Sequence, residues 1–439
     1  MNPKSSMAPI TDEHSLPVHL NLNVRGLEPS ATLAINERSN RLRREGRTIH
    51  KLGLGQSPFP VPTPLVDALR DNAFQKDYLA VRGLRELRDA VATYRRRRHG
   101  TDCSGDDVLI GPGSKELMFL LQLVYYGDLV IPTPTWVSYA PQAHIIGRHV
   151  RWLDTKESDG WRLTADAMDR LCSEDPGRPR IVILNYPSNP TGGTYHPREL
   201  EDLAAVARRH HCVLLSDEIY GELHHKGRHI SIARFYPEGT ITSSGLSKWC
   251  GAGGWRLGTF IFPRGLRWLL DAMSIVASET YTSTCAPIQH AAVRAFQGGT
   301  EIESYLKHSR RILHSLGKKL AGRLRAAGIE VAPPQGGFYL FPSFHPHREA
   351  LAARGLTDSV SLCERLLEDK GVAILPGSHF GRPREELTAR LAYVDFDGAE
   401  ALAASQSMPL EEPLDDSFVE THCGGVLEAA DKICAWIEE

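Results

Sequence analysis

Residues 180–220, RIVILNYPSNPTGGTYHPRELEDLAAVARRHHCVLLSDEIY, contain two short apolar runs on either side of an amphipathic segment. The runs at 180–184 and 212–215 are rich in Val, Ile and Leu and are too short for helices, so they are predicted to be buried strands. Segment 198–209 carries apolar residues at the spacing of one helical face, namely Leu200, Leu203, Ala204 and Ala207. A strand, a helix and a strand in this order predict a parallel sheet with helices on its faces.

Further segments with the patterns of buried strands and amphipathic helices lie on both sides of this unit. Residues 240–243 and 259–262 are predicted to be further strands of the sheet. After Gly113, apolar residues at helical spacing predict a helix that begins near residue 114, namely Leu117, Leu120, Leu121 and Val124. Segment 302–327 is predicted to be one long helix that ends at Gly328.

The C-terminal part has a different pattern. Short strands at 337–341 and 372–375, with a helix at 362–369, suggest a smaller α+β unit. The proline-containing acidic stretch at 405–417 is interpreted as an exposed loop that precedes a final helix near 425–437.

Charge and cysteine usage restrict the class of protein. With 51 basic and 53 acidic residues the net charge is −2, so no global field attracts nucleic acid or an anionic membrane, and small molecules are the expected partners. The 8 cysteines show no CxxC pair and no zinc-like spacing with histidine, which predicts reduced thiols, a cytoplasmic protein and no bound metal. No window approaches the ~20 apolar residues of a membrane helix. The basic run at 95–98 is interpreted as the solvated end of a helix.

Polar clusters follow three of the predicted strands directly. They are Asn-Tyr-Pro-Ser-Asn-Pro-Thr-Gly-Gly at 185–193, Ser-Asp-Glu-Ile-Tyr at 216–220, and Ser-Gly-Leu-Ser-Lys-Trp-Cys-Gly-Ala-Gly-Gly-Trp-Arg-Leu-Gly at 244–258. Ligands of open α/β sheets bind just beyond the carboxyl ends of the strands, so these clusters are the expected site.

In their order and spacing these motifs resemble the class I and II aminotransferases of pyridoxal-phosphate (PLP) fold type I. The resemblance rests on Asn-Pro-Thr-Gly at 189–192, Asp-Glu-Ile-Tyr at 217–220, and Ser-Lys with Gly-Trp-Arg eight residues on. It covers about residues 27–393, with further matches such as Gly-Ser-Lys at 113–115, Pro-Thr-Trp at 134–136 and Gly-Gly-Phe-Tyr at 336–339.

The resemblance implies the aspartate aminotransferase-like α/β fold, a large domain with a mostly parallel sheet between helices plus a smaller α+β domain. We expect a flexible segment at 1–26, a large PLP-binding domain at 27–300, and a small C-terminal domain at 301–439. The first part of the large domain, 27–55, is expected to be an arm that contributes a loop to the substrate site. The first 26 residues could close over the substrate or could be disordered.

The chemistry of PLP requires two functional groups, and the sequence offers a candidate residue for each. An amine must attack the cofactor aldehyde to form a Schiff base, and Lys248, in a Gly-rich turn after a strand, is the candidate. The pyridine nitrogen must stay protonated, which requires a buried carboxylate, and Asp217 at a strand end suits that role. By resemblance, Asn189 and Tyr220 hydrogen-bond the cofactor's 3′-oxygen, and Asn189 also borders the substrate.

The remaining cofactor contacts follow from the resemblance together with the chemistry of phosphate. A dianionic phosphate needs cations and a helix N-terminus, and the expected ligands are Ser114, Lys115, Ser247 and Arg256. Trp136 resembles the aromatic residue that stacks on the pyridine ring, with a core tryptophan as the alternative. Tyr78 resembles the tyrosine that reaches the phosphate of the neighbouring subunit of a homodimer, with a packed tyrosine as the alternative.

Two residues are expected to bind the substrate. Arg390 is a planar bidentate donor for an α-carboxylate, and Gly55 would supply a backbone N–H at close approach. The chain also departs from the family twice. Gly245 stands where many relatives have a serine or threonine that contacts the phosphate, and Ser278 stands where enzymes for dicarboxylic amino acids often have an arginine.

These features predict a transaminase that moves an amino group from an L-amino acid, neutral or aromatic rather than dicarboxylic, to a 2-oxo acid. In this scheme the freed amine of Lys248 removes the Cα proton, and two half-reactions give ping-pong kinetics. Two alternatives stay open. One is a β-lyase or aminocyclopropane carboxylate synthase-like lyase on the same scaffold, and the other is a PLP-binding regulatory protein without turnover.

Overall fold

A computed structural model describes residues 19–439 of the chain. The expected flexible segment therefore lies mostly outside the described residues, because only residues 19–26 are part of the structure. These eight residues form an exposed turn ahead of α1 (Ala31–Arg44). No helix of the described part is both long enough and apolar enough to cross a membrane.

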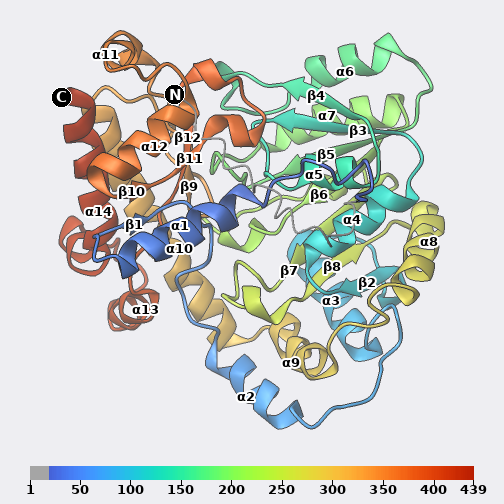
Figure 1. Cartoon of the computed structure of the whole chain (residues 1–439). Helices are drawn as coiled ribbons and strands as arrows, with labels where there is room; N and C mark the ends of the chain where they lie inside the picture. Colours follow the sequence, from blue (N-terminus) through green and yellow to red (C-terminus); the bar gives the residue numbers. More distant parts are fainter. Residues whose placement is uncertain (1–18) are drawn as a thin grey trace, which may run out of the picture.

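A seven-stranded sheet forms the centre of the larger half of the molecule (Figure 1). The strand order is β2-β8-β7-β6-β5-β3-β4. In that order the strands are β2 (Val108–Gly111), β8 (Gly258–Ile261), β7 (Thr240–Gly245), β6 (Val213–Asp217), β5 (Arg180–Asn185), β3 (Asp128–Thr133) and β4 (Val150–Asp154). The strands from β7 to β4 pair in parallel, and β8 is antiparallel to both of its neighbours. The predicted parallel sheet is thus observed, with an antiparallel strand at 258–261.

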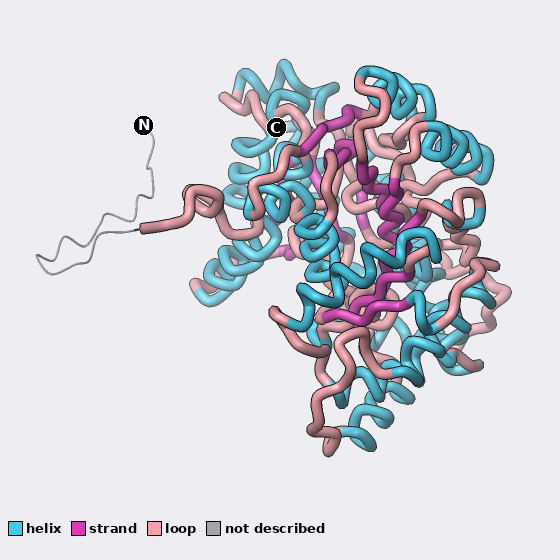
Figure 2. Tube along the Cα trace, turned by 90° about the vertical axis from the view of Figure 1, so that its right-hand side faces the viewer, coloured by secondary structure: helices cyan, strands magenta, loops and turns pink. Residues whose placement is uncertain are grey.

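Helices cover both faces of the sheet, and the strand residues alternate between them. Ile181 and Ile183 belong to the cluster under three helices, whereas Val182 and Leu184 belong to the cluster under two others. The first three are α4 (Ser114–Val124), α5 (Tyr139–Ile145) and α8 (Arg267–Ser278), and the other two are α6 (Ala165–Glu174) and α7 (Pro197–Arg209). This alternation is what the two-residue period of a strand requires when both faces are buried. Figure 2 shows the strands as a central band between helices.

The helices of the larger half match the predicted positions closely at α4 and α7. They are α2 (Thr63–Asn72), α3 (Arg85–His99), α4 (Ser114–Val124), α5 (Tyr139–Ile145), α6 (Ala165–Glu174), α7 (Pro197–Arg209), α8 (Arg267–Ser278) and α9 (Ala286–Gln297). The long predicted helix is α10 (Thr300–Ala326), which runs from the larger half into the C-terminal part (Figure 1).

The C-terminal part contains a three-stranded antiparallel sheet in the order β11-β12-β9. Its strands are β11 (Leu375–Pro376), β12 (Ala389–Ala392) and β9 (Tyr339–Leu340). The surrounding helices are α11 (Arg348–Ala353), α12 (Ser359–Lys370), α13 (Gly398–Gln406) and α14 (Asp416–Glu438). This part is the small α+β unit that the sequence pattern suggests.

The arm at 27–55 lies against the C-terminal part. Its strand β1 (His50–Lys51) pairs in parallel with β10 (Val372–Ala373). Ile35 and Leu42 of α1 pack on a small cluster that includes Leu367 of α12. The boundary expected at residue 300 coincides with the start of α10, but one apolar cluster continues across it. The division into domains stays a prediction.

Two expectations about surface segments are only partly met. The helix expected near 425–437 is the second part of α14, but helix already begins at Asp416, inside the expected loop, because Asp415 caps it by accepting a hydrogen bond from the Phe418 N–H at 2.8 Å. The helix bends at Cys423, which lies outside helical dihedral angles just before two glycines. The basic run at 95–98 is not wholly solvated, since Arg95 is buried and forms an ion pair with Glu218.

Candidate active site

The three polar clusters meet at the carboxyl edge of the central sheet. Asn185 ends β5 and Asp217 ends β6, and the two residues are register partners. The Asn185 side chain donates to the Asp217 carbonyl at 3.0 Å and accepts from the Asn189 N–H at 2.8 Å. Asn185 therefore fixes the turn that presents Asn189. Lys248 lies in the turn that follows β7.

Asp217 is a buried carboxylate with few donors. It is 3% exposed, and its Oδ2 accepts a hydrogen bond from the Tyr139 hydroxyl at 2.6 Å. Burial raises the pKa of this carboxyl to about 6, and the hydrogen bond from Tyr139 opposes the rise. A cation beside such a carboxylate would stabilise its charged form, and a protonated pyridine nitrogen would supply that cation.

The Lys248 amine is close to the arm. Its Nζ donates to the Gly55 carbonyl at 2.8 Å and lies 5.9 Å from the centre of the Tyr220 ring. Burial, together with the nearby Arg390 and Arg256 cations, lowers the pKa of Lys248 to about 8. An amine with this pKa is a usable nucleophile and base near neutral pH. Gly55 meets Lys248 through its carbonyl. The predicted contact of the Gly55 N–H with the substrate stays a prediction.

The start of α4 forms a narrow cradle with β8. A Cβ atom on Gly258 would overlap the Ser114 backbone nitrogen, and one on Gly113 would overlap the Arg256 guanidinium. Arg256 has a φ of 53° and donates to the Gly253 carbonyl at 2.9 Å. The free N–H groups of the helix start and this cation form the kind of site that phosphate requires.

Lys115 and Trp136 lie beside this cradle. The Lys115 Nζ is 5.1 Å from the centre of the Trp136 ring, and that ring meets Tyr139 edge-on. Ser247 is half-buried in the turn next to Lys248, and its hydroxyl has no hydrogen-bond partner in residues 19–439. Tyr78 is apart from all of these residues, at 88% exposure in the segment between α2 and α3.

Arg390 is a buried guanidinium from β12. It is 1% exposed, donates to the Asn189 side-chain oxygen at 3.2 Å, and also donates to the Gly53 carbonyl. Its Nε has no partner within the described chain. The guanidinium carbon lies 4.9 Å from the centre of the Tyr339 ring and 5.0 Å from that of Phe380. A buried cation with an unused donor is suited to a carboxylate ligand.

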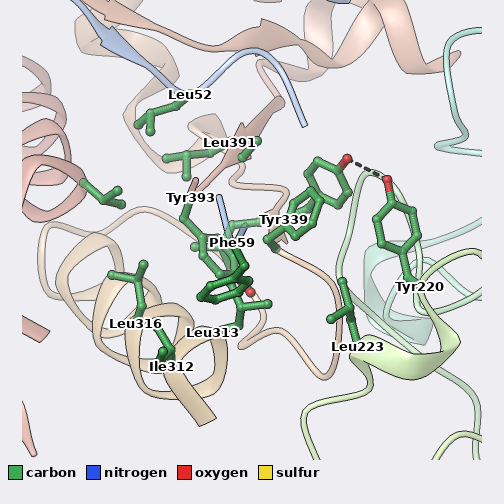
Figure 3. Packing of buried hydrophobic residues seen from close by; sticks show 14 of the residues in the cluster. Leu52, Phe59, Tyr220, Leu223, Ile312, Leu313, Leu316, Tyr339, Leu391 and Tyr393 are labelled. Carbon is green, nitrogen blue, oxygen red and sulfur yellow. Dashed lines mark hydrogen bonds between the residues drawn. The ribbon is translucent and has the colours of Figure 1, made fainter. Parts of the chain in front are cut away.

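Two tyrosines of the site carried no role in the sequence interpretation. Tyr139 bonds Asp217, and the only signal for it was its place three residues after Trp136. Tyr339 belongs to the Gly-Gly-Phe-Tyr match, and its hydroxyl lies 2.7 Å from that of Tyr220 (Figure 3). Hydrogen bonds between residues 119 positions apart depend on the tertiary fold, so no local sequence pattern predicts them.

The residues present fit pyridoxal phosphate. A buried acid, a lysine of lowered pKa and a glycine-lined helix start lie along one edge of the sheet, in an arrangement that the ring nitrogen, the aldehyde and the phosphate of one molecule would need. The fold and this edge together define a PLP-dependent enzyme of fold type I.

Comparison with known proteins agrees with this class. Residues 47–400 match the family model described as aminotransferase class I and II. The asparagine–oxo-acid transaminase of Streptococcus mutans is 31% identical over 391 residues, which span 85% of this chain and 94% of that protein. The aspartate aminotransferase of Geobacillus stearothermophilus is 33% identical over 380 residues, spanning 84% and 93%.

Among solved structures, aspartate aminotransferase from Thermus thermophilus with maleate superposes with a TM-score of 0.80 at 27% identity. The match covers 95% of this chain and 100% of that one. The chain belongs to the class I and II aminotransferases. It is a transaminase that acts on amino and oxo acids and uses pyridoxal 5′-phosphate.

Proposed function

We propose that this transaminase binds its cofactor through Lys248 and exchanges a neutral or aromatic L-amino acid with a 2-oxo acid in a ping-pong reaction. The observation that carries the proposal is the Lys248 amine, held at the sheet edge with a pKa lowered to about 8 by burial. At pH 7 about one tenth of such an amine is deprotonated, against about one part in three thousand for an ordinary lysine. When bound, the cofactor supplies an electron sink for the substrate carbanion.

Asp217 and Lys248 are each proposed to act on a different proton of the reaction. The Asp217 carboxylate holds a proton at the pyridine nitrogen, and Tyr139 keeps the carboxylate oriented by its 2.6 Å hydrogen bond. The Lys248 amine takes the proton from the substrate Cα and would return it to the cofactor carbon C4′, on the other side of the imine nitrogen. Gly55, whose carbonyl accepts from Lys248, holds the amine in place before the cofactor binds.

Arg390 is proposed to bind the substrate α-carboxylate. Its buried guanidinium has one unused donor at Nε, and its bond to Asn189 places the amide beside the same ligand. Asn189 and Tyr220 are the proposed partners of the cofactor's 3′-oxygen. At the other end of the site, the proposed phosphate ligands are Ser114, Lys115, Ser247 and Arg256, and Trp136 is proposed to cover the ring.

Support for a neutral or aromatic substrate comes from two places. Ser278, the last residue of α8, provides no cation for a second carboxylate. A cavity of about 970 Å³ extends between α1, α4 and β11 and reaches Lys115. Its lining is mostly apolar and includes Leu27, Ile35, Phe119, Val137 and Leu375, while Arg38 and Lys115 are the cations that a second carboxylate would have to use there. The relatives named as aspartate aminotransferases make aspartate the competing donor.

The chain is further proposed to act as a cytoplasmic homodimer with shared active sites. Tyr78 supports the dimer, because a tyrosine that is 88% exposed on one chain is free to reach a second copy. All eight cysteines are free thiols within residues 19–439, which is typical of a reducing compartment.

The deciding experiment is a stopped-flow absorbance scan of the PLP-loaded protein against phenylalanine, leucine and aspartate, with Lys248→Ala as control. Conversion to pyridoxamine phosphate that a 2-oxo acid reverses supports the proposal, and kcat/KM at least tenfold higher for phenylalanine or leucine than for aspartate supports the substrate class. Faster turnover of aspartate overturns that class. S-methylcysteine, which has a leaving group at Cβ, is added to test the lyase alternative: ammonia and pyruvate from it, with a cofactor spectrum that recovers unaided, would mean a lyase.

A further inference from the structure

The hydroxyl groups of Tyr220 and Tyr339 meet inside the site from two distant parts of the chain. They lie 2.7 Å apart, and the two rings meet edge-on with centroids separated by 5.5 Å (Figure 3). Tyr220 follows β6 of the central sheet, whereas Tyr339 begins β9 of the C-terminal sheet. Both side chains are buried, at 3% and 1% exposure. This hydrogen bond therefore joins the two halves of the site directly.

We propose that Tyr339 is a positioning residue, which donates its hydroxyl proton to Tyr220 and so links the charge on Arg390 to the protonation of the bound cofactor. The proposal rests on the roles proposed above for Tyr220 and Arg390. Tyr339 lies between these two residues, with its hydroxyl on Tyr220 and its ring face 4.9 Å from the Arg390 guanidinium carbon. It is the one side chain of residues 19–439 that contacts both in this way.

The Tyr339 hydroxyl has no room to turn elsewhere. A Cβ atom placed on Gly55 would overlap that hydroxyl, so the arm packs directly against it. Tyr220 is its only hydrogen-bond partner in the described chain. Glycine at position 55 thus leaves the space that the Tyr339 hydroxyl occupies, which is a second use of this residue besides its carbonyl bond to Lys248.

The direction of the bond follows from the charges around the pair. Arg390 lies against the Tyr339 ring and lowers the pKa of both phenols, while Asp217 raises the pKa of Tyr220 and the Lys248 amine lies 5.9 Å from its ring. Tyr393 is the other phenol near Tyr339. Burial raises the pKa of Tyr220 well above its usual value of 10. At Tyr339 the Arg390 cation offsets part of the same rise in pKa. The more acidic phenol is the better donor, so Tyr339 donates and Tyr220 keeps its own proton for the cofactor's 3′-oxygen.

Hydrogen bonds in such a chain strengthen one another. With Arg390 unliganded, the cation makes Tyr339 a strong donor to Tyr220. Tyr220 is then a strong donor to the cofactor oxygen, which lowers the pKa of the cofactor's Schiff-base nitrogen. A substrate carboxylate on Arg390 neutralises that cation, weakens both bonds and raises the cofactor's pKa. Carboxylate binding is then coupled to the protonation of the cofactor through Tyr339, in parallel with the direct bond of Arg390 to Asn189.

The test is a pH titration of the visible absorption of the PLP-loaded protein, with 3-phenylpropionate as a carboxylate that has no amino group to react. Tyr339→Phe keeps the ring against Arg390 and removes only the hydroxyl. It is expected to raise the apparent pKa of the bound cofactor by about half a pH unit, and to reduce by about half the further rise that 3-phenylpropionate causes in the unmodified protein.

Two further variants make each outcome decisive. Tyr393→Phe removes a buried hydroxyl that bonds the Gly337 carbonyl at 3.3 Å, and it should titrate like the unmodified protein. Tyr220→Phe should shift the pKa more than Tyr339→Phe does. If Tyr220→Phe shifts the pKa but Tyr339→Phe does not, with or without 3-phenylpropionate, the inference is wrong and the proposed function stands. If Tyr220→Phe also has no effect, the proposed role of Tyr220 fails, and the inference falls with it.

Discussion

At the scale of single residues, Asp217 and Lys248 show opposite pKa shifts with the same first cause. Burial raises the pKa of the acid to about 6 and lowers that of the amine to about 8, so both shifts favour the neutral form. Each shift is a free-energy cost to the folded protein at the pH where the group is charged. The site therefore destabilises the protein that lacks its cofactor, in exchange for reactivity.

Asp217→Asn should stabilise the cofactor-free protein. The folded pKa of about 6 lies above the ordinary 3.8, so the cost of the ionised carboxyl is fully present above pH 6 and is lost as the pH falls toward 4. The free energy of unfolding should rise by about 2 to 3 kcal/mol at pH 7.5 and by about 1 kcal/mol at pH 4.5. Urea unfolding at the two pH values measures both gains, and transaminase activity should be lost.

Asp71→Asn is the matched control for this change, because Asp71 is exposed on α2. It should alter the free energy of unfolding by less than about 0.5 kcal/mol at either pH. An Asp217→Asn protein that is less stable than the unmodified chain at pH 7.5 would mean that the carboxylate is stabilised by its neighbours, against the expectation here.

At the scale of elements, the contact of β8 with the start of α4 decides whether the phosphate cradle exists. β8 passes so close to Ser114 that only glycine fits at position 258. The cradle is thus built from two elements that are about 140 residues apart in the chain, and their separation is fixed by the hydrogen bonds of β8 to β2 and β7.

Gly258→Ala should weaken cofactor binding by at least tenfold, because its Cβ would push the helix start away from the phosphate position. The PLP dissociation constant, measured by absorbance titration, is the readout. Gly254→Ala is the control from the same Gly-rich turn, since a Cβ there meets nothing within 4 Å. Equal dissociation constants for the two variants would contradict the close approach of β8.

A second contact between elements joins α3 to the end of β6. Arg95 and Glu218 form an ion pair at 2.8 Å, with side-chain exposures of 7% and 1%. Arg95→Ala would leave the Glu218 carboxylate buried without its cation, so the free energy of unfolding should fall by about 3 to 5 kcal/mol. Arg41→Ala removes only an exposed ion pair with Glu45 and should change the free energy of unfolding by less than about 1 kcal/mol. Thermal or urea unfolding distinguishes the two.

Arg95 also shows the limit of prediction from sequence. The strand-end clusters at 185–193 and 216–220 were predictable because motif, strand and turn are adjacent in the chain. Arg95 was interpreted as solvated, since its neighbours in sequence are arginines and nothing local reveals that Glu218 lies beside it. Tyr139 and Tyr339 were missed for the same reason, because each acts through a partner about 80 to 120 positions away.

At the scale of the whole molecule, the proposed homodimer with shared sites has a consequence that mixing experiments detect. Lys248→Ala and Tyr78→Ala should each be nearly inactive as pure proteins. If Tyr78 serves the partner's site, a hybrid dimer of the two variants contains one intact site and one doubly damaged site. Unfolding and refolding an equal mixture should then recover about one quarter of the unmodified activity. A mixture as inactive as its components would mean that Tyr78 does not act across a dimer.

The pairing of β1 with β10 has a consequence for the order in which the protein is made. Residues 50–51 leave the ribosome early, but their partner strand at 372–373 is synthesised more than 300 residues later. At roughly 10 residues per second the arm waits about half a minute for the strand against which it docks. Gly55, which meets Lys248 in the finished site, lies four residues past that strand. This part of the active site is thus translated long before it can be assembled, and no nascent chain that stops before residue 373 can be active.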